Sequence, residues 1–201
     1  MFWDQVAVFY DFFENCFNGE VNKKLVNEVA ALIEKGDIVL ECACGTGMIT
    51  KGISPRCEEV TATDFSEGML KQTQKNCAKL DNVKVEKADI MNLEFGDETF
   101  DKVVAGNVIH LLDEPYKALK ELLRVCKKGG YVIIPTYINN KTEEKPGFIV
   151  KCLEKLGADF KKEFNFDTYK QFFMKSGFKE AEYKLIRGRI PCAIAVIRKK
   201  G

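Results

Sequence analysis

Short runs of β-branched and apolar residues alternate with segments of helical periodicity through most of this 201-residue chain. This alternation restricts the chain to α/β folds, because two parallel strands are joined by a long crossover that is usually a helix. The runs predicted as strands are Ile38–Cys42, Val60–Thr63, Val83–Ala88, Lys102–Gly106, Tyr131–Thr136, Phe178–Arg187 and Ile190–Arg198. The segments predicted as helices are Val21–Lys35, Ser66–Lys79, Pro115–Lys127 and Asp167–Ser176.

The order of these segments predicts a Rossmann-like, doubly wound, mostly parallel sheet of seven strands with helices on both faces. Only Gly188 and Arg189 separate the last two runs, so we expect an antiparallel C-terminal hairpin. In an open sheet of this kind, ligands bind beyond the C-terminal ends of the strands. The residues that follow those ends are therefore the first candidates for a functional site.

Length and charge limit the kind of partner. The chain fits one domain over residues 1–201, and its 31 basic and 30 acidic residues leave a net charge of +1, which gives no attraction to nucleic acid. The longest stretch without a charged residue, Gly129–Asn140, is too short for a membrane span, which needs about 20 apolar residues. No Lys or Arg precedes Lys23, unlike the basic start of a secretion signal. We expect a cytoplasmic monomer or homodimer that acts on a small molecule.

The eight cysteines are scattered along the chain, and we expect them to be reduced. Only Cys42 and Cys44 lie close together, and the single histidine, His110, is far along the chain from both. Zinc usually takes four Cys or His ligands at recognisable spacing, so no metal site is predicted.

The most specific motif is Val39–Gly47, a hydrophobic strand that contains Glu41 and opens into a turn with Gly45 and Gly47. Glycine lets a ligand approach the backbone closely. A dinucleotide fingerprint would have a third glycine at position 50, where this chain has Thr50, and an apolar residue in place of Glu41. The motif therefore fits a nicotinamide dinucleotide poorly.

In this motif the sequence resembles the class I S-adenosylmethionine-dependent methyltransferases, in which an acid precedes a small-residue turn ending in Gly-x-Gly. Ala43 replaces the usual first glycine, and the resemblance extends from Val21 to Arg198. It implies that Glu41, Ala43, Gly45 and Gly47 bind S-adenosylmethionine, with S-adenosylhomocysteine as the product.

Two further acids follow predicted strands. Asp64 ends the second strand, and the two oxygens of its carboxylate suit the vicinal hydroxyls of a ribose, although Asp64 could instead cap the following helix. The resemblance implies that Phe65 and Met69 lie against the adenine. It also implies that Asp89 accepts a hydrogen bond from the adenine amine; a turn-forming acid is the alternative for this position. The flanking residues expected to sandwich the base are Ala88 and Ile90.

The run Thr99–Leu112, followed by Asp113-Glu114-Pro115, resembles the fourth-strand segment of small-molecule methyltransferases. The resemblance implies that Asn107 and Val108 line the cofactor and that His110 faces the substrate. Because its ordinary pKa is near neutrality, His110 is the candidate general base, with packing at the strand end as the alternative.

The first seventeen residues hold seven of the 22 aromatic residues of the chain. We interpret residues 1–20 as an aromatic lid helix over the reaction site, although one aromatic face could simply dock on the domain. By resemblance, Tyr10 touches the methionine carboxylate and is a second candidate catalytic residue. Residues 137–166 are interpreted as an insertion near the substrate.

The predicted function is transfer of the methyl group of S-adenosylmethionine to a small molecule by in-line SN2 attack, with the acceptor atom left open. An NAD-dependent oxidoreductase would share the sheet and Asp64. A non-catalytic module that binds S-adenosylmethionine is the other alternative.

Overall fold

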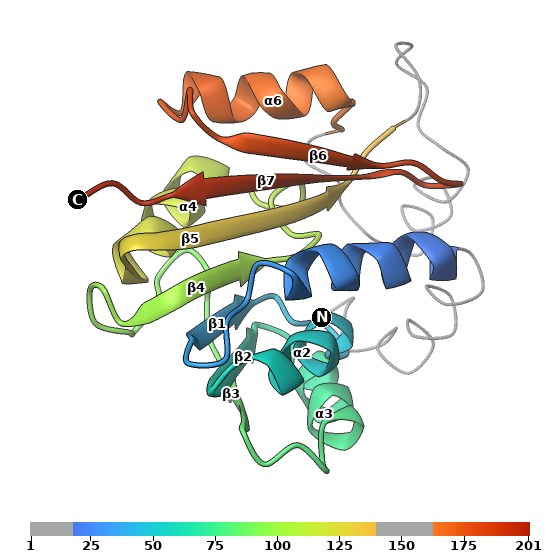
Figure 1. Ribbon diagram of the computed structural model, residues 1–201, viewed down its shortest axis with the longest axis vertical. Helices are drawn as coiled ribbons and strands as arrows, with labels where there is room; N and C mark the ends of the chain where they lie inside the picture. Colours follow the sequence, from blue (N-terminus) through green and yellow to red (C-terminus); the bar gives the residue numbers. More distant parts are fainter. Residues whose placement is uncertain (1–17, 140–162) are drawn as a thin grey trace.

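A computed structural model describes residues 18–139 and 163–201 of the protein (Figure 1). Seven strands form one sheet in the order β3-β2-β1-β4-β5-β7-β6. The strands are β1 (Ile38–Cys42), β2 (Glu59–Asp64), β3 (Val83–Lys87), β4 (Phe100–Ala105), β5 (Cys126–Tyr137), β6 (Glu182–Ile186) and β7 (Cys192–Arg198). The helices are residues 18–30, α2 (Met48–Ile53), α3 (Glu67–Asn76), α4 (Pro115–Val125) and α6 (Phe166–Lys175), with a 3-10 turn η1 (Ser54–Arg56) after α2.

The strand pairing confirms the predicted fold class. Strand β1 pairs in parallel with β2 on one side and with β4 on the other. Strand β7 is antiparallel to both β5 and β6, which confirms the C-terminal hairpin. Because the chain runs outward from β1 to β3 and then returns to β4, the direction of winding reverses beside β1, and a ligand site is expected at the C-terminal ends of β1 and β4.

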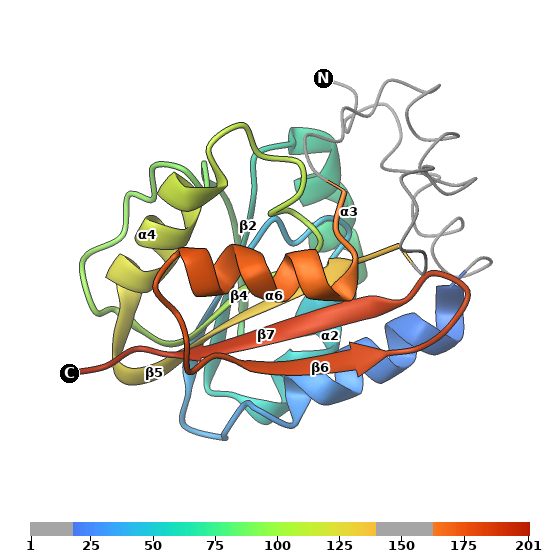
Figure 2. The same ribbon diagram turned by 90° about the horizontal axis from the view of Figure 1, so that it is seen from above.

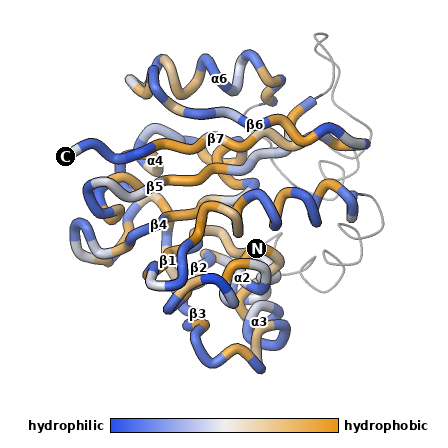
Figure 3. The backbone as a smooth tube through the Cα atoms, viewed as in Figure 1, coloured by the Kyte–Doolittle hydropathy of each residue, from blue (hydrophilic) through white to orange (hydrophobic). Residues whose placement is uncertain are grey.

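Helices cover both faces of the sheet (Figure 2). Residues of α4 and α6 pack in one apolar cluster with Leu40, Val103 and Val132. The helix of residues 18–30 and α2 pack in a second cluster with Val39 and Val104, so neighbouring residues of β1 and β4 face opposite clusters. The central strands are apolar along much of their length, whereas the edge strand β3 carries polar residues and is largely hydrophilic (Figure 3).

Several boundaries differ from the sequence predictions. Strand β5 begins at Cys126 rather than Tyr131, and α4 ends at Val125, because the chain passes straight from helix to strand there. Gly130 permits this direct passage into the strand, because a side chain at position 130 would place its Cβ only 2.4 Å from the carbonyl oxygen of Asp101. Strand β6 begins at Glu182, several residues later than predicted.

Two predicted segments lie largely outside the described residues. The proposed lid helix over residues 1–20 is described only from residue 18, where the helix of residues 18–30 begins. The insertion over residues 137–166 is described only at its two ends. In the described ranges, no helix has the length and apolar character needed to traverse a bilayer.

A buried ion pair joins the segment before β1 to β4, away from the C-terminal strand ends. The Lys102 Nζ lies 3.0 Å from Asp37 Oδ1, and the two side chains are 8% and 10% exposed. Asp37 Oδ2 also accepts a hydrogen bond from the backbone N–H of Glu34 at 2.7 Å. Lys102 Nζ lies 5.4 Å from the centre of the Tyr131 ring as well.

We predict that Lys102→Met lowers the free energy of unfolding by about 3 kcal/mol, because it leaves the buried Asp37 carboxylate without its counter-ion. The double variant Lys102→Met/Asp37→Asn should recover part of this loss, since no buried charge remains. Urea denaturation of the three proteins measures both effects. A loss below about 1 kcal/mol in the single variant would contradict the prediction, because it would equal that of a surface ion pair.

Candidate functional site

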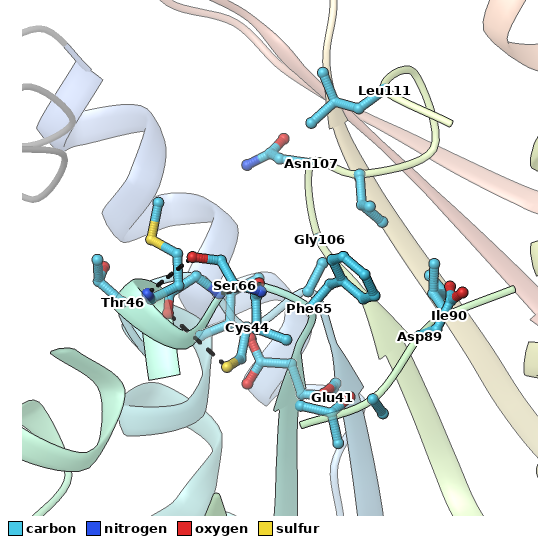
Figure 4. A pocket seen from close by; sticks show the side chains of 18 of the residues that line it. Glu41, Cys44, Thr46, Phe65, Ser66, Asp89, Ile90, Gly106, Asn107 and Leu111 are labelled. Atoms are coloured by element: carbon cyan, nitrogen blue, oxygen red, sulfur yellow. Dashed lines mark hydrogen bonds between the residues drawn. The ribbon is translucent and has the colours of Figure 1, made fainter. Parts of the chain in front are cut away.

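A cavity of about 310 Å³ opens at the C-terminal ends of β1, β2 and β4. Four segments line it: the turn after β1, the connection from β2 to α3, residues 88–91 after β3, and the loop after β4 (Figure 4). This is the position expected from the reversal in winding beside β1.

The cavity brings together most of the residues predicted to bind the cofactor. Those among its lining are Glu41, Ala43, Gly45, Asp64, Phe65, Met69, Ala88, Asp89, Ile90, Asn107 and Val108. Gly47 and His110 are not among the lining residues, and Tyr10 lies outside the described part of the chain. The three acids predicted at strand ends therefore share one crevice.

The turn after β1 is built on left-handed backbone conformations. Ala43, Gly45 and Gly47 have φ values of 55°, 56° and 86°. Gly47 precedes α2, and a Cβ there would lie 3.1 Å from the Thr73 Cγ2 and 3.2 Å from the Cys77 Sγ of the neighbouring helix segment. Gly47 thus permits close packing behind the turn, and its predicted role in cofactor binding stays a prediction.

Asp64 connects two walls of the cavity. Its Oδ2 accepts a hydrogen bond from the backbone N–H of Gly45, and its Oδ1 accepts one from the N–H of Ser66, both at 2.9 Å. The cap of α3 is Ser66, whose Oγ accepts from the N–H of Met69 at 3.2 Å, so the capping alternative for Asp64 does not hold. An ionised carboxylate has about four acceptor sites, so Asp64 retains capacity for a ligand hydroxyl.

Glu41 lies at the floor of the cavity and is 1% exposed. Its Oε2 accepts a hydrogen bond from Thr50 Oγ1 at 2.5 Å. Burial raises the pKa of Glu41 to about 8; the hydrogen bond from Thr50 opposes this shift and the charge of Asp64 adds to it. At pH 7 the carboxyl group is therefore mostly protonated, and a cation bound beside it would favour its ionised form.

An apolar slot lies beside Asp89. The ring of Phe65 is 52% exposed and faces Ile90 and Asp89 across the cavity (Figure 4). Asp89 Oδ1 accepts a hydrogen bond from the N–H of Met91 at 2.8 Å. A flat ring inserted between Phe65 and Ile90 would meet apolar surface on both faces and a carboxylate at its edge.

On the far side of the cavity, Asn107 follows β4 with a φ of 52°. Its N–H donates to the carbonyl oxygen of Pro135 at 2.8 Å, and its Oδ1 accepts from the N–H of Tyr137 at 3.0 Å. The loop that carries Asn107 and Val108 is thus held against β5.

Comparison with known proteins identifies the family. The family described as "Methyltransferase domain" matches residues 40–134, which run from β1 into β5. A demethylmenaquinone methyltransferase of Staphylococcus carnosus (strain TM300) is 30% identical, over 94% of this chain and 88% of the relative. The chain belongs to the class I S-adenosylmethionine-dependent methyltransferases.

Two other comparisons agree with this. A demethylmenaquinone methyltransferase of Clavibacter sepedonicus is 39% identical, over 49% of this chain and 40% of that relative. The solved structure of a methyltransferase from Aquifex aeolicus that depends on S-adenosylmethionine has a TM-score of 0.66 at 21% identity, covering 92% of this chain and 90% of that one. The enzyme is thus a methyltransferase, and the match in fold extends over nearly the whole chain.

His110, the candidate general base of the methyltransferase, is buried outside the cavity. It is 7% exposed and lies outside the lining of the cavity. Burial lowers the pKa of His110 to about 4, so the imidazole is neutral at pH 7 and is a weak base. This placement agrees with the packing alternative.

Neither disulfides nor a metal cluster is found in the described ranges, which contain six of the cysteines, all buried and free. One of them, Cys44, lines the cavity and lies 3.6 Å from Thr73 Oγ1. Burial raises the pKa of the Cys44 thiol well above its ordinary value, so it is not a nucleophile at neutral pH.

Sequence reasoning missed Thr50, which holds the acid of the main motif. It also missed ten lining residues that lie in or just after the motif, or near the ends of the second, third and fourth strands: Cys44, Thr46, Met48, Ile49, Thr63, Ser66, Met91, Gly106, Leu111 and Leu112. If the helix that begins at Met48 had been recognised from the sequence, it would have placed Thr50 near the end of β1. Helix α2 has only six residues, however, which is too short to show a periodic pattern.

We predict that Ala43→Gly stabilises the unliganded methyltransferase by about 1 kcal/mol, because glycine adopts a φ of 55° without the steric cost that alanine bears. Gly45→Ala is the matched control, since its φ is 56° and no heavy atom lies within 4 Å of the added Cβ. It should destabilise by a similar amount. Thermal unfolding tests both, and equal melting temperatures for all three proteins would contradict the backbone argument.

The pH dependence of stability should report Glu41. Because its pKa is about 8 in the fold and 4.5 ordinarily, the folded state holds a proton that the unfolded chain releases between these values. This contribution to stability is complete below pH 4.5 and is lost as the pH rises toward 8. Between these two pH values, the free energy of unfolding should fall with a slope that approaches about 1.4 kcal/mol per pH unit.

Glu41→Gln removes the titrating group and keeps an acceptor for Thr50. Urea denaturation from pH 5 to 8 should show a shallower decline in the variant than in the wild type. Glu58→Gln, at an exposed position, is the control and should follow the wild type. Identical slopes in the wild type and Glu41→Gln would show that Glu41 titrates normally.

Proposed function

We propose that the cavity binds S-adenosylmethionine and that the enzyme transfers its methyl group to a small-molecule acceptor. The observation that carries this proposal is the composition of the lining: within residues 18–139 and 163–201 it has three carboxyl groups, Glu41, Asp64 and Asp89, and no Lys, Arg or His. Such a lining favours a cationic ligand rich in hydrogen-bond donors.

The arrangement of the acids fits the parts of this cofactor. Asp89 and the apolar slot between Phe65 and Ile90 suit an adenine, whose amine donates to a carboxylate. Asp64 suits the ribose hydroxyls. Glu41 lies beside the glycine turn, where the ammonium group of the methionine part would supply the cation that this buried carboxyl group lacks.

A nicotinamide dinucleotide fits the same lining less well. Its pyrophosphate carries two negative charges, whereas the part of the lining that the structure describes offers carboxyl groups and no basic side chain to balance them. The dinucleotide alternative therefore conflicts with the electrostatics of the cavity as well as with the motif.

Methyl transfer needs little from the protein beyond positioning the donor and the acceptor and excluding water. S-adenosylmethionine supplies a methyl group activated by a positive sulfur, open to in-line SN2 attack by a nucleophile. The residues of this chain orient the donor through the three acids and keep the loop with Asn107 and Val108 against β5. With His110 buried outside the cavity, we assign no general base among the described residues.

The acceptor we propose to test first is demethylmenaquinone, because relatives of this chain are named for methylating it. The apolar side chains of Val108, Leu111 and Leu112 at the cavity suit an apolar ring. Formation of S-adenosylhomocysteine only when an acceptor is added would support catalysis. Its absence with demethylmenaquinone and with a panel of amines, thiols and phenols would favour the non-catalytic binding module.

We predict that Asp64→Asn weakens binding of S-adenosylhomocysteine by about 1.5 to 3 kcal/mol, roughly 10- to 150-fold, because it removes a charge-assisted hydrogen bond to the ribose. Asparagine has nearly the same volume, so the turn is disturbed less than by alanine. Glu86→Gln on the exposed edge strand is the control and should bind normally. Isothermal titration calorimetry measures both, with NADH as a competitor ligand. Tighter binding of NADH than of S-adenosylhomocysteine would overturn the proposal.

A further inference from the structure

The connection between β3 and β4 contains no helix of its own, and its first residues form one wall of the cavity. Residues 88–91 line the cavity, and residues 88–99 contain no helix. Within this connection, Asp89 sits in a tight turn: its carbonyl oxygen accepts from the N–H of Asn92 at 2.9 Å, and its Oδ1 accepts from Met91. This turn is continuous with residues 93–97, so whatever holds those residues also holds the end of the turn that carries Asp89.

Arg124, in the last turn of α4, holds this connection through its guanidinium. Its Nη2 donates to the carbonyl oxygen of Leu93 at 2.7 Å, and its Nη1 donates to the carbonyl oxygen of Phe95 and to Asp97 Oδ1, both at 2.8 Å. Leu93 is four residues after Asp89 and is itself buried. The connection is thus fixed to α4, none of whose residues lines the cavity.

Glu121, one turn earlier on α4, completes the arrangement. Its two carboxylate oxygens accept from Arg124 Nε and Nη2, both at 2.9 Å. Its Oε2 also accepts from the N–H of Leu93 at 2.9 Å, so both polar backbone groups of Leu93 are bound. The guanidinium lowers the pKa of Glu121, which is therefore ionised at neutral pH.

These contacts use all five N–H donors of Arg124 in a single planar arrangement, which a lysine cannot reproduce. The far end of the connection is held separately, because the carbonyl oxygens of Arg124 and Val125 accept from the N–H groups of Glu98 and Thr99. Loss of the guanidinium would free residues 93–97, next to the turn that carries Asp89, without releasing β4.

We propose that Arg124 and Glu121 are positioning residues for recognition of the base: by fixing residues 93–97 to α4, they keep Asp89 directed at the exocyclic amine of adenine. This inference rests on the proposed function, because it assumes that the adenine lies against residues 88–91. It goes further in assigning selectivity for the base to two residues that do not line the cavity.

The test compares two ligands that differ only at the base. S-inosylhomocysteine has a carbonyl oxygen where S-adenosylhomocysteine has the amine, so Asp89 should favour the adenine compound by about tenfold or more. We expect Arg124→Met to reduce this preference at least threefold, and Arg124→Lys to reduce it as well. Lys127→Met is the matched control: Lys127 forms an ion pair with Asp101 at 2.8 Å, and neither residue lines the cavity. It should retain the preference.

A double-mutant cycle distinguishes positioning from general stability. If Arg124 acts through Asp89, Arg124→Met should have no further effect on the preference once Asp89→Asn is present. An unchanged preference in Arg124→Met, with only a lower melting temperature, would overturn the inference.

Glu121→Gln serves as the second variant if Arg124→Met does not fold, and it should also reduce the preference. A wild type that binds neither ligand would instead contradict the proposed function, whereas a wild type with the preference and an unaffected Arg124→Met would contradict only this inference.

Discussion

The carboxylate of Asp64 is the interaction on which the geometry of the site depends. It accepts one hydrogen bond from the turn after β1 and one from the start of the connection to α3. The connections that leave the sheet after β1 and after β2 are thereby joined to each other at the cavity. Without this link, the turn of Ala43 and Gly45 would rely on its own strained backbone to keep its shape.

The electrostatics of the cavity follow from the same arrangement. Burial of Glu41 disfavours its ionisation; the hydrogen bond from Thr50 offsets this only in part, and the charge of Asp64 on the adjacent strand adds to it. In the unliganded protein the Glu41 carboxyl group is therefore mostly uncharged. A cation bound beside it would restore its negative charge. The proposed ligand, with a sulfonium and an ammonium group, would match such a site, because a cation beside Glu41 favours the ionised form of this acid.

The sequence was sufficient to predict the features that depend on local patterns. The apolar runs Ile38–Cys42 and Ile190–Arg198 identified strands, and the short link at Gly188 and Arg189 identified the hairpin. The alignment of acids with strand ends placed Glu41, Asp64 and Asp89 in one cavity, because parallel strands bring their C-terminal ends to the same edge of the sheet.

The features that were missed depend on contacts between distant segments. The motif predicted Gly47 as a ligand contact, which stays a prediction; it did not indicate the packing of Thr73 and Cys77 behind this glycine. His110 was selected for its ordinary pKa, whereas its burial, which no local pattern reveals, shifts that pKa away from neutrality. The contact of Arg124 with Leu93 spans 31 residues of sequence and has no local signature.

The most direct test of this account is a crystal structure of the protein with S-adenosylhomocysteine. The account predicts the adenine between Phe65 and Ile90 with its amine at Asp89, the ribose hydroxyls at Asp64, and the amino acid part beside the glycine turn above Glu41. Density for the ligand elsewhere on the protein, or in this cavity with the base directed away from Asp89, would contradict it.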